Sequence, residues 1–74
     1  MSRLIRMDQT GHTTLAEWTV DDEASVEVAV TAFREELENG SIAMVTRGPG
    51  HAEHVRELPL DENLVIMRRP IAGG

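Results

Sequence analysis

Histidine and glutamate side chains gather in one short stretch, "GHAEHVRE", where a metal ion could bind. His51 and His54 lie three residues apart, with Glu53 and Glu57 beside them. Structural zinc sites use four ligands at fixed spacings, and residues three apart on a strand point to opposite faces. We therefore interpret both histidines as solvated loop residues and expect no metal site.

A hydroxyl nucleophile beside a base is the second arrangement that could do chemistry. Thr13 and Thr14 supply hydroxyls and His12 supplies a base, but no third group is placed to orient them. The "GPG" at 48–50 lacks the lysine and the helix start of a phosphate loop, so it is interpreted as a turn. We expect a protein that is not itself an enzyme and needs no cofactor.

The remaining candidate is the final stretch, "RRPIAGG", residues 68–74. Glycine at 73 and 74 leaves the backbone without side chains and permits angles that other residues cannot adopt. An α-carboxyl group has a pKa of about 3.3 to 3.7, so a carboxylate on Gly74 would be ionised at neutral pH. The alternative is that Gly73 and Gly74 are a frayed end without a role.

Composition excludes several classes of partner and site. The chain has 74 residues, a net charge of −6 and no cysteine, which excludes disulfides and cysteine-based metal sites. Seven scattered basic residues do not form the basic surface that nucleic acid requires. No apolar run approaches the roughly 20 residues of a membrane span, and none near the start suits a signal peptide. We expect one soluble, cytoplasmic domain that binds neither nucleic acid nor membrane.

All basic residues are arginine, at positions 3, 6, 34, 47, 56, 68 and 69. Codon preference is the simple explanation. A chain without lysine also cannot accept an isopeptide bond on a side chain, which suits a protein whose own terminus becomes an electrophile.

Two runs that favour strands, "RLIRMD" and "TTLAEWTV", open the chain. Alternation in the second places Ala16, Trp18 and Val20 on one face, as in a half-buried strand. Gly11, between the runs, can adopt the positive φ of a tight turn. We predict a hairpin with Trp18 in the core; an exposed Trp18 would instead indicate a partner-binding surface.

Helical periodicity follows over 22–39. Alternation of valines at 26, 28 and 30 favours a strand, but the length of the segment and its capping residues favour a helix. Asp21 or Asp22 can cap its start, and Asn39-Gly40 can end it. The acids at 35, 36 and 38 are interpreted as the solvent-exposed flank. The predicted buried face consists of Val26, Ala29, Val30, Phe33 and Leu37.

Three further strands complete the pattern. "SIAMVTR" is predicted to be a strand, and the charged "HVREL" a short edge strand. Leu64-Val65-Ile66-Met67 is apolar on consecutive residues, which indicates a strand inside the sheet rather than at its rim. Pro70, which lacks an N–H, would end its pairing.

This order of elements resembles the β-grasp fold of ubiquitin-like proteins. The segment "RLIRMDQTGHTTLAEWTVDDEASVEVAVTAFREELENG" resembles the opening of that superfamily, with a hairpin turned at Thr10-Gly11, an acidic helix entry at Asp21-Asp22 and a stop at Asn39-Gly40. The tail resembles two branches. Its arginine pair before Gly-Gly is similar to that of ubiquitin, and its Pro-Ile-Ala-Gly-Gly is similar to the Pro-Val-Ala-Gly-Gly endings of sulfur carriers such as the small subunit of molybdopterin synthase.

The resemblance implies an α+β, β-grasp-like fold in which one helix, at about 22–39, covers one mixed sheet. The strand-strand-helix-strand-strand-strand order would form a single ubiquitin-like domain over 1–69, followed by a flexible C-terminal tail over 70–74.

The resemblance also implies a function. A partner activating enzyme would adenylate the Gly74 carboxylate, for sulfur transfer or for conjugation to a downstream acceptor protein. Gly73 and Gly74 would be the carrier or conjugation site, and Arg68, Arg69 and Pro70 would serve tail recognition. The alternative is a non-enzymatic module that binds another protein and does not use its glycines.

Overall fold

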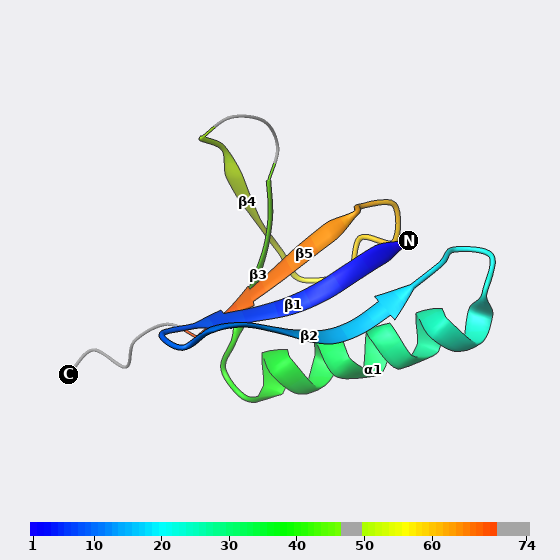
Figure 1. The fold of residues 1–74 in the computed structure, drawn as a ribbon, viewed down its shortest axis with the longest axis horizontal. Coiled ribbons are helices and arrows are strands. Elements are labelled where there is room, and N and C mark those ends of the chain that lie inside the picture. The colour runs from blue at the N-terminus through cyan, green and yellow to red at the C-terminus, as the bar shows by residue number, and fades with distance from the viewer. Residues whose placement is uncertain (47–49, 70–74) are drawn as a thin grey trace.

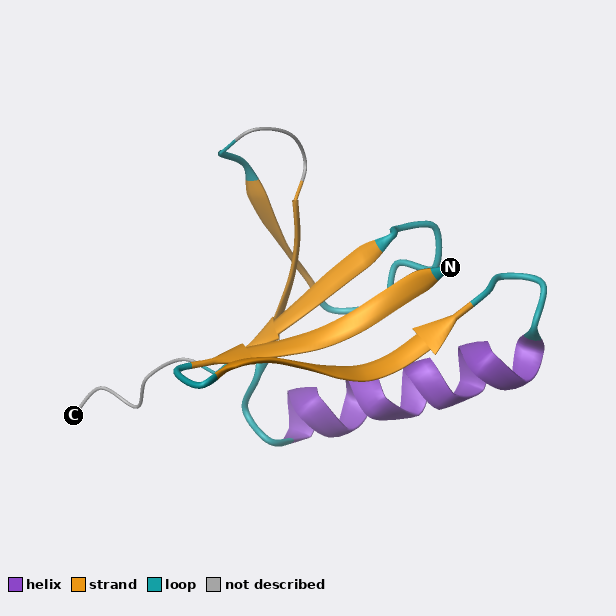
Figure 2. Ribbon diagram, in the orientation of Figure 1, coloured by secondary structure: helices purple, strands orange, loops and turns teal. Residues whose placement is uncertain are grey.

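The computed structural model describes residues 1–46 and 50–69 of the chain. Five strands form one mixed sheet in the order β2-β1-β5-β3-β4, and a single helix lies across one face of it (Figures 1 and 2). The predicted α+β fold of β-grasp type is thus confirmed. Along the chain the elements are β1 (Ser2–Asp8), β2 (Gly11–Trp18), α1 (Glu23–Glu38), β3 (Ile42–Thr46), β4 (Ala52–Val55) and β5 (Leu64–Arg68).

The last strand, β5, lies in the middle of the sheet. It pairs parallel to β1, with Leu4 opposite Val65, and antiparallel to β3, with Ala43 opposite Met67. The central position predicted from the apolar run is confirmed. The helix covers only one face, however, so Val65 and Met67 are fully buried while Leu64, which points the other way, is 43% exposed.

The predicted hairpin joins β1 and β2. Asp8 and Gly11 are opposite each other, so the turn itself consists of residues 9 and 10. Gly11 has a φ of +124°, the positive value expected of it. The second strand ends at Trp18, two residues earlier than predicted, and Val20 is 61% exposed rather than buried.

The helix runs from Glu23 to Glu38, within one residue of the predicted 22–39 at each end, and Asp22 and Asn39 cap it. The Asp22 side chain accepts a hydrogen bond from the backbone N–H of Ser25 at 3.3 Å. At the other end Gly40, with a φ of +94°, donates to the carbonyl of Leu37, and Ser41 donates to the carbonyl of Glu36. This pair of bonds is a Schellman motif, in which glycine takes the left-handed conformation that ends a helix.

No helix in the described part of the chain is long and apolar enough to cross a membrane.

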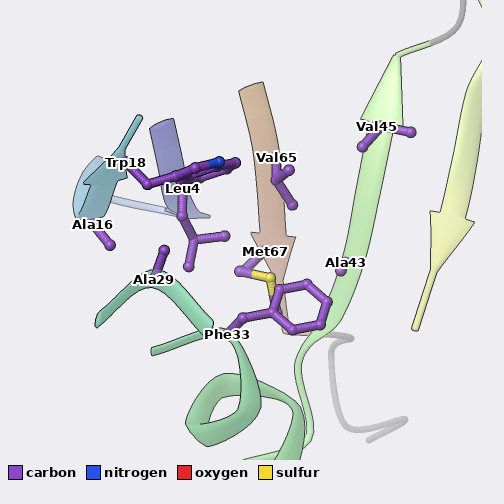
Figure 3. Packing of buried hydrophobic residues seen from close by; sticks show 9 residues of the cluster. All are labelled: Leu4, Ala16, Trp18, Ala29, Phe33, Ala43, Val45, Val65 and Met67. Carbon is purple, nitrogen blue, oxygen red and sulfur yellow. The ribbon is translucent and has the colours of Figure 1, made fainter. Parts of the chain in front are cut away.

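The core lies between α1 and the sheet (Figure 3). Trp18 and Phe33 are its largest members, and both are almost completely buried. Trp18 is therefore a core residue, as predicted. Its indole N–H also donates to the carbonyl of Leu60 at 3.2 Å, which ties β2 to the segment between β4 and β5. The full cluster is Leu4, Ala16, Trp18, Ala29, Phe33, Ala43, Val45, Val65 and Met67.

The short charged strand lies at the edge of the sheet, as predicted. It is β4, which pairs only with β3 and starts two residues before the predicted "HVREL".

The prediction that the acids at 35, 36 and 38 are all exposed to solvent is wrong for Glu36. Its neighbours Glu35 and Glu38 are exposed, but Glu36 is only 7% exposed. The carboxylate accepts hydrogen bonds from the Ser41 hydroxyl at 3.0 Å and from the Arg6 guanidinium at 3.3 Å. The side chain is buried because these partners, from β1 and from the end of the helix, replace the water that it loses.

Replacing Glu36 by alanine should destabilise the fold, because the Ser41 hydroxyl would be left buried without its acceptor. We expect Glu36→Ala to lower the free energy of unfolding by about 2 kcal/mol in urea denaturation. The matched variant Glu35→Ala removes the same charge from an exposed position. It should change the free energy of unfolding by less than about 0.5 kcal/mol. Equal effects of the two substitutions would contradict a structural role for Glu36.

Candidate functional site at the end of the last strand

The end of β5 is where the predicted tail leaves the sheet. Arg68, the last residue of β5, is opposite Met7 of β1 on one side and Ile42 of β3 on the other. Because β1 and β5 are parallel, both strands end at the same edge of the sheet, beside the β1–β2 turn (Figure 1). The chain therefore leaves from between two strands rather than from a rim.

Two of the predicted tail-recognition residues are described, and both are exposed. They are Arg68 and Arg69, at the end of β5 and directly after it. Pro70, Gly73 and Gly74, with the rest of the predicted tail over 70–74, lie outside the described residues.

Two hollows adjoin this end of β5 and share four lining residues. One, of about 290 Å³, is lined by Arg6, Met7, Asp8, Gln9 and Arg69. The other, of about 270 Å³, has Arg68 in place of Arg6. The edge of the sheet at which the tail begins is thus lined by three guanidinium groups and one carboxylate.

Asp8 is held in its ionised form by the turn that follows it. Its carboxylate accepts hydrogen bonds from the Thr10 hydroxyl at 2.6 Å and from the Thr10 backbone N–H at 2.8 Å. These two bonds, and to a smaller extent the charge of Arg6, hold the pKa of Asp8 below its ordinary value of 3.8. Sequence reasoning missed Asp8, although an aspartate two residues before a threonine in a predicted turn is typical of this hydrogen bonding.

The arginines at this edge differ in how far they are already engaged. Arg6 is held by Glu36 at 3.3 Å, and its side chain is about one third exposed. Arg68 and Arg69 form no ion pair within residues 1–46 and 50–69. They are available to bind carboxylates of a partner, for which the planar guanidinium is well shaped.

The hydroxyl and histidine residues on β2 are not brought together as a catalytic group. His12 is opposite Met7 and Thr13 is opposite Arg6, so their side chains point to opposite faces of the sheet. Thr14 shares the face of His12 but lies two residues along the strand, about 6 to 7 Å away. Neither threonine is placed to give its proton to His12.

The histidines near β4 do not form a metal site. His54 lies on β4 opposite Met44, His51 precedes the strand, and both are exposed. Within the residues that the structure describes, no group of three or more histidine and acidic side chains could hold a metal ion.

No family model matches the chain, and neither a curated protein nor a solved structure matches it. A function must therefore be argued from the fold and from the geometry at the end of β5.

Replacing Thr10 by valine tests the hydrogen bonding at the turn. The hydroxyl is the largest cause of the lowered pKa of Asp8, so we expect this pKa to rise towards 3.8 in Thr10→Val. Carboxyl ¹³C shifts followed against pH would measure it in both proteins. An unchanged pKa would mean that the backbone N–H alone holds the charge.

The same substitution has a consequence for stability. A lowered pKa in the folded state means that the Asp8 carboxylate stabilises the fold above pH 3.8, and that this contribution is lost as the pH falls through the folded value. Thr10→Val should therefore be less stable than the parent at neutral pH, and the difference should shrink in acid.

Proposed function

We propose that this chain is a ubiquitin-like carrier or modifier whose Gly74 carboxylate is adenylated by a partner activating enzyme. The observation that carries the proposal is the placement of β5. The last strand pairs parallel to the first, in a sheet covered by one helix, and it ends at Arg68 beside the β1–β2 turn. That arrangement is β-grasp-like, as the order of elements implies, and the "RRPIAGG" ending resembles the tails of ubiquitin and of sulfur carriers.

The chemistry of the proposal requires little from the chain itself. The ionised Gly74 carboxylate attacks the α-phosphate of ATP, which forms an acyl adenylate and releases pyrophosphate. A sulfide, thiol or amine then attacks the activated carbonyl and displaces AMP. The partner supplies the acid–base and phosphate chemistry, and glycine at 73 and 74 keeps the carbonyl accessible.

The exposed arginines have a role in recognition. Arg68 and Arg69 stand at the point where the chain leaves the sheet and present two cations on a protein of net charge −6. Acidic residues of the activating enzyme would bind them and so direct the tail into a narrow crevice. The ionised Asp8 carboxylate beside them would repel a partner that places an acidic residue at the β1–β2 turn.

Incubation with ATP in a lysate of the source organism tests the proposal. We expect intact-mass spectrometry to show replacement of a Gly74 oxygen by sulfur, or a covalent adduct of the chain through Gly74. The reaction should stop without ATP and with an ATP analogue whose α,β-bridge is methylene, since neither allows pyrophosphate to leave. A terminus that stays unmodified under all conditions would argue strongly against a carrier function.

The face of the sheet opposite α1 favours a second candidate, a module that binds another protein without using its glycines. Ile5, Ile66 and Met44 are successive partners across β1, β5 and β3, on the face that the helix leaves uncovered. Ile5 is itself buried, and Ile66 and Met44 are half-buried. Met7 and Leu64 share this face, two residues along β1 and β5 from that row, and are each 43% exposed. Apolar residues on an open sheet face are typical of partner-binding surfaces.

Deleting Gly73 and Gly74 separates the two candidates. A binding module should retain its partners after the deletion and lose them in Leu64→Glu, which places a charge on the open face at the other end of β5 from Arg68. A carrier should lose its function when Gly73 and Gly74 are deleted and keep it in Leu64→Glu. Affinity capture followed by mass spectrometry, with circular dichroism as the control for folding, would measure both variants.

A further inference from the structure

A third hollow, of about 330 Å³, lies between α1 and the segment that joins β4 to β5. It is separate from the residues at the end of β5, since none of the lining residues is shared. The helix contributes Val30, Phe33 and Arg34, and the joining segment contributes Arg56, Glu57, Leu58 and Leu60.

The inner part of this hollow is apolar. Phe33 belongs to the core and is 2% exposed, while Val30, Leu58 and Leu60 are half-buried around it. Leu58 and Leu60 pack against the core cluster, so their side chains already have fixed neighbours. An apolar group that enters would displace water from these surfaces without disturbing the core.

The wall formed by the joining segment is held in place by hydrogen bonds. The Trp18 indole donates to the carbonyl of Leu60 at 3.2 Å, and the N–H of Glu62 donates to the carbonyl of Pro59 at 3.1 Å. A wall that is already ordered loses less conformational freedom when a ligand binds. The hollow is therefore formed before any partner arrives.

Two cations stand at its rim. Arg34 and Arg56 are exposed, and neither forms an ion pair within the described residues, whereas Arg3 and Arg6 are both paired with glutamates. Glu57 also lines the hollow, so the three charged residues together leave it with a net positive charge. On a protein of net charge −6, this favours an anionic group next to the apolar floor.

From these features we infer that the hollow binds a peptide segment of a partner protein in which a large apolar side chain is flanked by carboxylates. The apolar side chain lies against Leu58 and Leu60, and the carboxylates bind Arg34 and Arg56. A peptide is favoured over a free small molecule because the hollow is partly open to solvent and would leave part of a ligand uncovered. Small-molecule sites bury about 70 to 90% of their ligand. One inserted anchor side chain is typical of protein interfaces.

Titration of the ¹⁵N-labelled full chain with two capped peptides tests this inference. The acidic probe is Ser-Glu-Leu-Phe-Glu-Ser, and its neutral match is Ser-Gln-Leu-Phe-Gln-Ser. We expect the acidic peptide to shift the amide signals of Val30, Arg34, Arg56, Leu58 and Leu60, and to bind at least about fivefold more tightly than the neutral one. Equal affinities, shifts confined to other surfaces, or no binding of either peptide would overturn it.

Charge variants locate the site. Arg34→Gln and Arg56→Gln should each lower the affinity for the acidic peptide about three- to fivefold and leave the affinity for the neutral peptide unchanged. Arg3→Gln, an equal change of charge near Glu17, should affect neither. Sodium octanoate that bound as tightly as the acidic peptide would assign the hollow to a free fatty acid and contradict the peptide.

The inference does not depend on the carrier function. A chain that lacks Gly73 and Gly74 should bind the acidic peptide as the parent does, because those residues are far along the chain from the hollow. Loss of binding on that deletion would place the peptide at the tail and overturn the assignment.

Discussion

The parallel pairing of β1 with β5 is the constraint on which the rest of the structure depends. Parallel strands need a crossover connection, and here that connection contains every other element of the fold. The register that sets Leu4 beside Val65 places both side chains under α1, where neither is exposed. The same register brings the ends of both strands to one edge, beside the β1–β2 turn.

A small core explains why much of this surface stays exposed. A domain of this length buries only about 60% of the surface of its unfolded chain, and one helix covers one face of the sheet. Specific polar contacts therefore help to join the layers. Glu36 links the helix to Arg6 of β1, and the Trp18 indole ties the joining segment before β5 to β2.

Two pairs of exposed arginines give this acidic protein two positively charged surface sites. Arg68 and Arg69 stand at the end of β5, and Arg34 and Arg56 stand at the rim of the hollow between α1 and the joining segment. The two proposed contacts use different residues, so an acidic partner at Arg68 and Arg69 would not compete for the guanidiniums that line the hollow. Salt screens the attraction to exposed guanidiniums as well as the repulsion by the remaining acids, so both proposed contacts should weaken as the ionic strength rises.

The sequence by itself determined the elements that depend on local chemistry. The helix was predictable from its period, from Asp22 at its start and from Asn39-Gly40 at its end, and the central place of β5 from its continuous apolar run. Only the tertiary structure decided which charged residues are buried and where a hollow forms. Glu36 looks like its exposed neighbours in the sequence, and its burial depends on Arg6, thirty positions away in the chain. Such contacts carry no local signal, because they arise only when the sheet brings distant segments together.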